Sequence, residues 1–180
     1  MKLHTIVKLL ILGLSLSCFS CDLTIDGPNN HYHIPFTNNS ADSIYAIWYG
    51  KYSHLMGDYF RDTLLWSYYY APSYDPFVYK IGPGEENKGA ISCLRAFEEV
   101  LPYEIDTLLV FVFNADTLDI YGWDTVCTYY KVEQRYDLSL EELQNLDFKL
   151  SFPPTEAMKH IHMWPPYGTY DEHGRRKDTK

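Results

Sequence analysis

Two pairs of histidines have the spacing of metal ligands. His31 and His33 form one pair, His160 and His162 form the other, and Met163 adjoins the second pair. Alternate residues of an extended chain point to the same side, and imidazole together with a thioether suits copper or zinc. However, no cysteine or carboxylate stands at a matching spacing. We therefore expect exposed or capping histidines and no metal or other cofactor. The alternative is a metal site that uses His160 and His162 as ligands.

Local motifs that mark the common enzyme classes are absent from the sequence. It contains no nucleophile elbow, no His-Glu-x-x-His zinc motif and no phosphate-binding glycine loop. The glycine-rich stretch 82–89 includes Pro83, which lacks an amide donor, so we interpret this stretch as a turn. Adjacent acids such as Glu98 and Glu99 point in different directions on a helix. We predict a non-enzymatic protein, with an enzyme whose site is assembled from scattered residues as an alternative.

Aromatic residues gather in two short clusters outside the clearest strands. The first cluster contains Trp66 and Tyr69, and the second contains Trp164 and Tyr167. Exposed rings can stack on the apolar faces of sugars or anchor a protein partner. Rings can also simply cover the ends of a β domain, which is the interpretation we favour here. Glycan binding by these four residues is the first alternative.

The first 20 residues have the organisation of an export signal. A basic start with Lys2 and Lys8 precedes an apolar run, and small residues follow. The run is about a dozen residues long, whereas a transmembrane helix needs roughly 20. The stretch resembles a bacterial lipoprotein signal, in which a cysteine after small residues is acylated and becomes the mature N-terminus. We predict lipidation at Cys21, with Cys18 as one alternative and export without a lipid as another, and a tether over residues 21–31.

Removal of residues 1–20 leaves Cys93 and Cys127 as the only thiols besides the lipidated one. Such a pair can form a disulfide in an oxidising compartment. The segments that contain these cysteines flank Thr107–Phe113, so both could pack on the same side of it. We predict a disulfide between Cys93 and Cys127, with two buried free thiols as the alternative.

The composition favours one β-rich domain. Aromatic residues make up 17% of the chain, which suits pleated, half-buried surfaces and excludes a disordered chain. A net charge of −9 disfavours binding to nucleic acid. We predict a mainly β, α+β fold: an antiparallel, β-sandwich-like domain over 32–167 with two or three short helices, followed by a polar tail over 168–180.

Hydrophobic patterns locate the strands of this domain. The continuous apolar run over 107–113 predicts a strand that is buried on both faces. Pro35 places the first strand at the edge of a sheet, because proline cannot donate to the ladder. The predicted strands cover residues 32–36, 43–49, 77–81, 107–113, 130–136 and 148–152.

Three short helices are predicted from local signals. Leu94, Phe97 and Leu101 recur at helical spacing and indicate a short amphipathic helix. A second brief helix is expected over 122–130. A Ser-x-x-Glu capping box at Ser139 predicts the start of the third.

Part of the chain is similar to a group of small bacterial lipoproteins without an assigned activity. The similarity is carried by residues 106–113, by Trp123-Asp124-Thr125-Val126 and by residues 135–143. It implies export and anchoring in the cell envelope by an N-terminal lipid, as in an outer-membrane lipoprotein of a Gram-negative bacterium. It implies no activity and no catalytic residue. We therefore expect a membrane-anchored envelope protein that binds or supports a protein or glycan partner.

Overall fold

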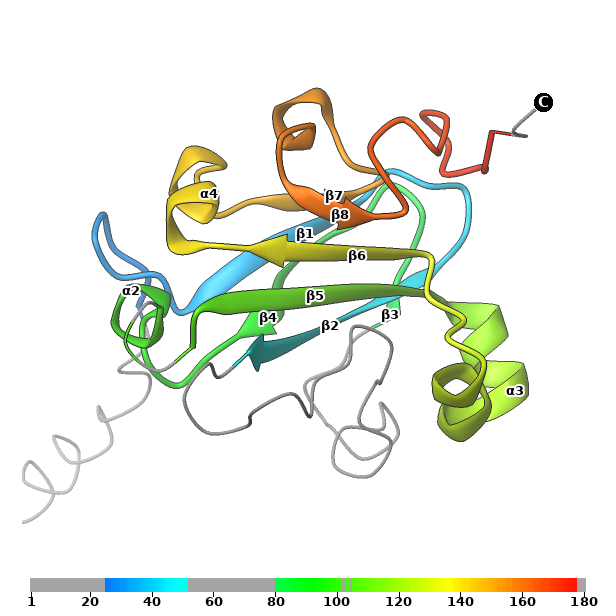
Figure 1. Ribbon diagram of the computed structural model, residues 1–180, viewed down its shortest axis with the longest axis horizontal. Helices are drawn as coiled ribbons and strands as arrows, with labels where there is room; N and C mark the ends of the chain where they lie inside the picture. Colours follow the sequence, from blue (N-terminus) through cyan, green and yellow to red (C-terminus); the bar gives the residue numbers. More distant parts are fainter. Residues whose placement is uncertain (1–24, 52–79, 102, 104, 178–180) are drawn as a thin grey trace, which may run out of the picture.

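The computed structural model describes residues 25–51, 80–101, 103 and 105–177 (Figure 1). The strands are β1 (His33–Asn38), β2 (Ile44–Lys51), β3 (Lys80–Ile81), β4 (Glu86–Ser92), β5 (Thr107–Asn114), β6 (Gln134–Leu138), β7 (Leu150–Phe152) and β8 (His162–Trp164). The helices are α2 (Phe97–Val100), α3 (Ala115–Thr128), α4 (Leu140–Asn145) and the 3₁₀ helix η2 (Glu156–Met158). The mainly β, α+β class predicted from the sequence is confirmed.

The described strands form two sheets. One sheet has the order β4-β1-β7, and the other has the order β3-β2-β5-β6-β8. Neighbouring strands are antiparallel except for β1 and β7, which are parallel. The prediction of antiparallel pairing is therefore wrong for this one pair. The main core, a cluster that includes Phe36 of β1 and Val110 of β5, contains buried residues from both sheets.

β5 divides the hydrophobic residues into two cores. Its even-numbered residues from Leu108 to Val112 belong to the main core. Its odd-numbered residues from Leu109 to Phe113 belong to a second core, which also contains Trp123 of α3. All six residues inside the ends of the strand are buried, so the prediction of a strand buried on both faces is confirmed.

β1 lies at the centre of its sheet, so its predicted position at a sheet edge is wrong. The register with β4 shifts between Ile34 and Phe36, which places Pro35 at a bulge. The extra residues of this bulge lie on β4, and the pairing with β7 begins only at Phe36, so Pro35 is paired in neither ladder. Proline is therefore tolerated in this central strand because no ladder hydrogen bond needs its missing N–H.

The first two helices differ from their predicted boundaries. α2 starts only at Phe97, so Leu94 lies outside the helix and is 92% exposed instead of facing the core. α3 consists of two helical segments that meet at a kink, where Gly122 has non-helical φ +74° and ψ 163°. The second segment, which ends at Thr128, lies within the predicted range 122–130. The first segment was not predicted; it starts at Ala115, where the Asn114 side chain accepts a hydrogen bond from the Thr117 N–H and caps the helix.

The third helix begins as the sequence predicts. Glu142 N–H donates to Ser139 Oγ at 3.2 Å, and Ser139 N–H donates to the Glu142 carboxylate at 2.7 Å. Both halves of a capping box are thus present. The predicted N-cap of α4 is confirmed.

Asn38 is a buried polar residue at the end of β1. Its amide nitrogen donates to the carbonyl oxygens of Asp42 at 2.8 Å and Ile81 at 2.9 Å. Its amide oxygen accepts from the N–H of Ser40 at 3.0 Å and from the Ser40 hydroxyl at 2.6 Å. This single side chain therefore joins the turn after β1 to the end of β3.

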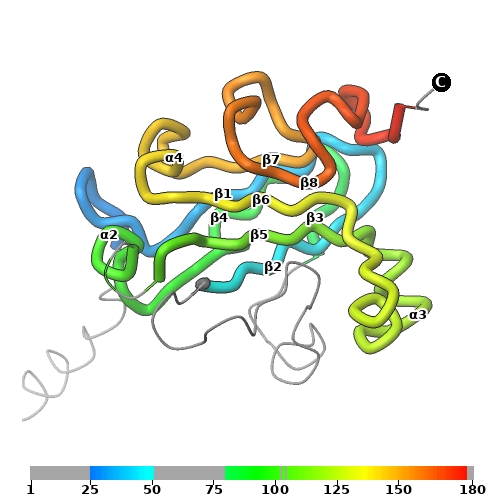
Figure 2. The backbone as a smooth tube through the Cα atoms, in the orientation of Figure 1, coloured from blue at the N-terminus to red at the C-terminus, as the bar shows by residue number. Residues whose placement is uncertain are grey.

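Residues 26–31, predicted as part of a tether, fold against the domain. Backbone hydrogen bonds of 2.9 and 3.4 Å close the turn 27–30. The Asp26 carboxylate accepts hydrogen bonds of 2.6 and 3.2 Å from two backbone N–H groups at the start of β1. The carbonyl oxygen of His31 accepts from the Phe97 N–H at 2.8 Å. The chain therefore enters the domain at a fixed place beside α2 (Figure 2).

Residues 168–177, predicted as part of a polar tail, are also folded onto the domain. Tyr170 is buried, and its hydroxyl donates to the Glu133 carbonyl oxygen at 2.5 Å. Its ring packs edge-on against Phe152, with ring centroids 5.1 Å apart. The tail prediction is wrong for these residues because one aromatic side chain anchors an otherwise polar segment.

Candidate functional site

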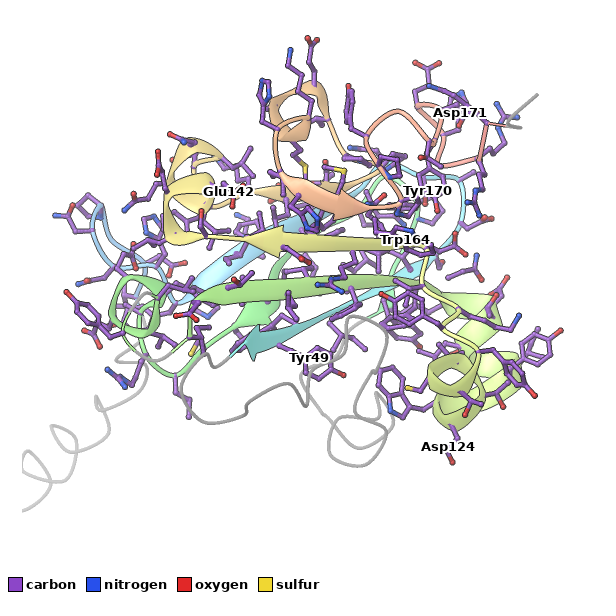
Figure 3. The ribbon with its side chains drawn as sticks, viewed as in Figure 1. Tyr49, Asp124, Glu142, Trp164, Tyr170 and Asp171 are labelled. Atoms are coloured by element: carbon purple, nitrogen blue, oxygen red, sulfur yellow. The ribbon has the colours of Figure 1, made fainter. Side chains whose placement is uncertain are left out.

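A pocket of about 450 Å³ lies beside the end of β7, within the size range of small-molecule sites. We call it the Tyr167 pocket. It is lined by the residue after β1, by the loop from β7 to η2 and by the C-terminal segment, to which Tyr170 and Asp171 belong (Figure 3). Its lining includes Asn39, Pro153, Pro154, Glu156, Tyr167, Asp171, Glu172 and Lys177.

Backbone contacts hold the C-terminal wall of this pocket in place. The Ala41 N–H donates to the His173 carbonyl oxygen at 2.9 Å. Within the C-terminal segment, the Lys177 N–H donates to the Thr169 carbonyl oxygen at 2.8 Å and closes the segment on itself. Gly174 has φ +75°, and a β-carbon at this position would collide with the Ser40 side chain. Glycine is therefore required where the C-terminal wall approaches the turn after β1.

Two of the carboxylates that line the pocket have cationic partners. Glu156 lies 3.2 Å from the Lys159 ammonium group. Asp171 accepts hydrogen bonds of 2.9 Å from the N–H groups of His173 and Arg175 and from the Arg175 guanidinium. The hydrogen bond from the Arg175 backbone is the main cause that lowers the pKa of Asp171 below its usual value. Asp171 is thus an ionised acceptor at neutral pH.

Of the two aromatic clusters of the sequence, the structure describes the second, which contains Trp164 and Tyr167. Tyr167 is 42% exposed and lines the pocket. Trp164 is 47% exposed but lies outside the pocket lining, and its ring packs against Tyr130 with centroids 5.6 Å apart. Trp66 and Tyr69 lie outside the described residues. Of the two predicted stacking residues that the structure describes, Tyr167 lines a pocket and Trp164 does not.

His160 and His162 do not form a metal site in the structure. His160 is exposed, whereas His162 Nδ1 lies 3.0 Å from the Asp137 carboxylate, which also accepts two hydrogen bonds from Arg135. Within the described part of the chain, no group of three or more His, Cys, Asp or Glu side chains is placed to hold a metal ion.

The other histidine pair makes structural contacts. His31 Nδ1 is paired with the Glu98 carboxylate, and the ring stacks on Phe148 with centroids 3.7 Å apart. His33 Nδ1 lies 3.2 Å from the Asp26 carboxylate. These contacts fasten the start of the domain to α2 and to the residues after α4.

The predicted disulfide is wrong. Cys93 and Cys127 are free thiols, and Cys93 packs against the main core whereas Cys127 packs against the second core. The central sheet separates the two cores, so the two sulfur atoms face different sides of β5. Burial, with a smaller contribution from Asp124, raises the pKa of Cys127 to about 12. Cys18 and Cys21, the predicted lipidation sites, lie outside the described residues.

Most of the pocket could not be identified from the sequence. Pro153 and Pro154 directly follow the last predicted strand and form part of one wall. Asp171 and Glu172 lie in the segment that was expected to be a tail. Tyr170, a large aromatic residue in that polar segment, is the signal that could have indicated a folded C-terminal wall.

Comparisons with known proteins give no relative. No protein-family model matches the chain, and no curated protein or solved structure matches it either. Among the described residues, no helix is both long enough and apolar enough to cross a membrane. The features that bear on function are therefore the Tyr167 pocket and the signal-like N-terminus.

Proposed function

We propose that this chain is a lipid-anchored protein of the bacterial cell envelope that binds a neutral glycan in the Tyr167 pocket without altering it chemically. The observation that carries the proposal is the half-exposed Tyr167 ring in a pocket that also contains hydrogen-bonding side chains. A sugar ring has an apolar face that stacks on an aromatic ring and hydroxyl groups that need polar partners. The pocket supplies both kinds of contact.

The charges around the pocket favour a neutral ligand. Glu156 and Asp171 are paired with Lys159 and Arg175. Glu172 and Lys177 add one charge of each sign to the lining. Paired charges attract a free cation or anion less strongly than unpaired ones. Their oxygen atoms can still accept hydrogen bonds from hydroxyl groups. A ligand with many hydroxyl groups and no net charge therefore fits these walls best.

The state of Asp171 supports binding in preference to catalysis. Acid catalysis of glycoside cleavage uses a carboxylic acid with a raised pKa as the proton donor. Asp171 instead accepts three hydrogen bonds that lower its pKa. It is therefore suited to accept a hydrogen bond from a ligand and not to give up a proton.

A glycan array tests the ligand class. The full mature protein should bind a subset of neutral glycans, and Tyr167→Ala should bind them about tenfold more weakly. Tyr129→Ala is the matched control, because Tyr129 is an exposed tyrosine on another surface, at the end of α3. An array without any bound glycan would contradict the proposed ligand class, and release of sugar products from a bound glycan would show that the protein is an enzyme.

Metabolic labelling with a palmitate analogue tests the anchor. Wild-type protein should carry the label and fractionate with the outer membrane of a Gram-negative host, and Cys21→Ala should abolish both. Cys18→Ala is the matched control and should keep the label. Labelled Cys21→Ala together with unlabelled Cys18→Ala would assign the lipid to Cys18, and absence of label from wild-type protein would contradict the anchor.

A further inference from the structure

One end of the molecule exposes three large apolar side chains around the place where the chain enters the domain. Ile25, Leu94 and Tyr103 are 76%, 92% and 80% exposed. They belong to the N-terminal segment, to the residues before α2 and to the residues after it. Isolated exposed apolar residues are ordinary. Three of them on converging segments indicate a surface that contacts something apolar.

Hydrogen bonds show that these segments meet. Phe97 N–H donates to the His31 carbonyl oxygen at 2.8 Å, and Cys93 N–H donates to the Tyr32 carbonyl oxygen at 2.9 Å. The His31 N–H also donates to the Glu98 carboxylate at 2.8 Å. In Figure 2, residues 25–32 and α2 lie together at one end of the long axis, and α3 lies at the other. We call the end with α2 the entry end.

Several charged and polar groups at the entry end have local partners. Arg95 lies 3.5 Å from Glu99, and Glu98 is paired with His31. Pairing reduces the cost of bringing these groups close to an apolar phase. The entry end thus combines exposed apolar side chains with charges that have local partners, which suits the surface of a zwitterionic lipid bilayer.

We propose that the entry end lies against the lipid bilayer, with Leu94 and Tyr103 inserted into its interfacial region. This inference rests on the proposed lipid anchor at Cys21. Only four peptide steps separate Cys21 from Ile25, and they span at most about 14 Å when fully extended. The anchor therefore keeps Ile25 near the membrane, and the folded turn 27–30 fixes the orientation of the domain relative to it. Tyrosine is favoured at the membrane–water interface, where its ring is apolar and its hydroxyl is hydrated.

This orientation agrees with the position of the Tyr167 pocket. The labelled pocket residues Tyr170 and Asp171 lie toward the end of the long axis that is opposite to α2 (Figure 3). A bilayer at the entry end would leave the pocket open to the aqueous phase. The same chain can therefore be anchored and still reach a soluble glycan.

Site-directed spin labelling tests the orientation. The full lipidated chain, with Cys93→Ala and Cys127→Ala to remove the other thiols, is reconstituted in phosphatidylcholine vesicles with a label at Leu94→Cys. A label at Ile120→Cys is the matched control, because Ile120 is 73% exposed on α3 at the opposite end. We expect the ratio of oxygen accessibility to water-soluble nickel-chelate accessibility to be severalfold higher at position 94 than at position 120. A third label at Tyr103→Cys repeats the test in case the Leu94 variant does not fold.

The outcomes separate this inference from the anchor on which it rests. A chain that stays bound to the vesicles but shows equal, water-like ratios at positions 94, 103 and 120 overturns the orientation and leaves the anchor intact. A chain that does not associate with vesicles overturns both. Low accessibility to both reagents at position 94 would indicate contact with a second copy of the protein and would also overturn the bilayer contact.

Discussion

Replacement of Asn38 by alanine should strongly destabilise the fold. The side chain makes four hydrogen bonds, at 2.8, 2.9, 3.0 and 2.6 Å, and is fully buried. Alanine removes all four and leaves the carbonyl oxygen of Ile81 without this donor in a buried place. A typical hydrogen bond contributes about 0.5–1.5 kcal/mol, and a buried group left unpaired costs about 1–3 kcal/mol. Because the Ser40 hydroxyl can still donate to the Asp42 carbonyl oxygen, part of the loss is recovered, and we expect a net loss of about 3 kcal/mol.

Urea unfolding measures this loss. With a slope of about 2 kcal/mol per molar urea, a loss of about 3 kcal/mol shifts the midpoint down by about 1.5 M. Asn145→Ala is the matched control, because Asn145 is exposed near the end of α4 and its replacement should change the stability by less than about 0.5 kcal/mol. A shift for Asn38→Ala no larger than that of the control, at an unchanged slope, would refute the idea that this side chain joins β1 to β3.

Three further predictions concern other parts of the fold. Ser139→Ala should cost about 1 kcal/mol in the same urea assay because it removes the N-cap of α4, and an unchanged midpoint would exclude the cap. Gly174→Ala should destabilise the protein, because Gly174 has a positive φ and an added β-carbon would collide with Ser40. Gly27→Ala is the control and should be nearly neutral, because nothing lies within 4 Å of the added carbon. Equal effects of the two replacements would contradict the close approach at the pocket wall. Thiol titration of the denatured mature protein should find Cys93 and Cys127 free. In the native protein, Cys127 should be alkylated at pH 8 about a thousandfold more slowly than an ordinary cysteine, because its pKa is about 12 instead of 9.0. Folding raises this pKa, so the neutral thiol contributes fully to the free energy of unfolding below about pH 9, and this contribution is lost as the pH rises toward 12. The free energy of unfolding should therefore fall over that pH range. Rapid alkylation of native protein would contradict the burial of Cys127.

Features that depend on neighbouring residues could be predicted from the sequence. The run over 107–113 is apolar at every position after Thr107, so it had to be a strand covered on both faces wherever the other strands paired. The capping box at Ser139 needs only residues within one helical turn, and it is present as predicted. The turn predicted over 82–89 is present at Gly82-Pro83-Gly84, where Gly84 adopts φ +74° between β3 and β4, but residues 86–89 belong to β4.

Features that depend on distant partners could not be predicted in this way. Pro35 is compatible with a central strand only because β4 pairs with β1 around a bulge, which no local pattern reveals. The positions of Cys93 and Cys127 on opposite sides of β5 depend on how the residues after β4 and the helix α3 pack on the sheet. One wall of the Tyr167 pocket contains Tyr170, which reaches Glu133 across the fold. Its walls therefore come from segments that look like a loop and a tail in the sequence.

The affinity of the pocket for a glycan that the array identifies is the most direct test of the proposed function. Titration calorimetry on the full mature protein should show that Tyr167→Ala weakens binding by about tenfold, the loss expected when one stacking contact of about 1.4 kcal/mol is removed. Trp164→Ala is the comparison, because Trp164 is similarly exposed but lies outside the pocket lining and should leave the affinity unchanged. Equal affinities of wild-type and Tyr167→Ala protein, or a loss confined to Trp164→Ala, would contradict the assignment of glycan binding to the Tyr167 pocket.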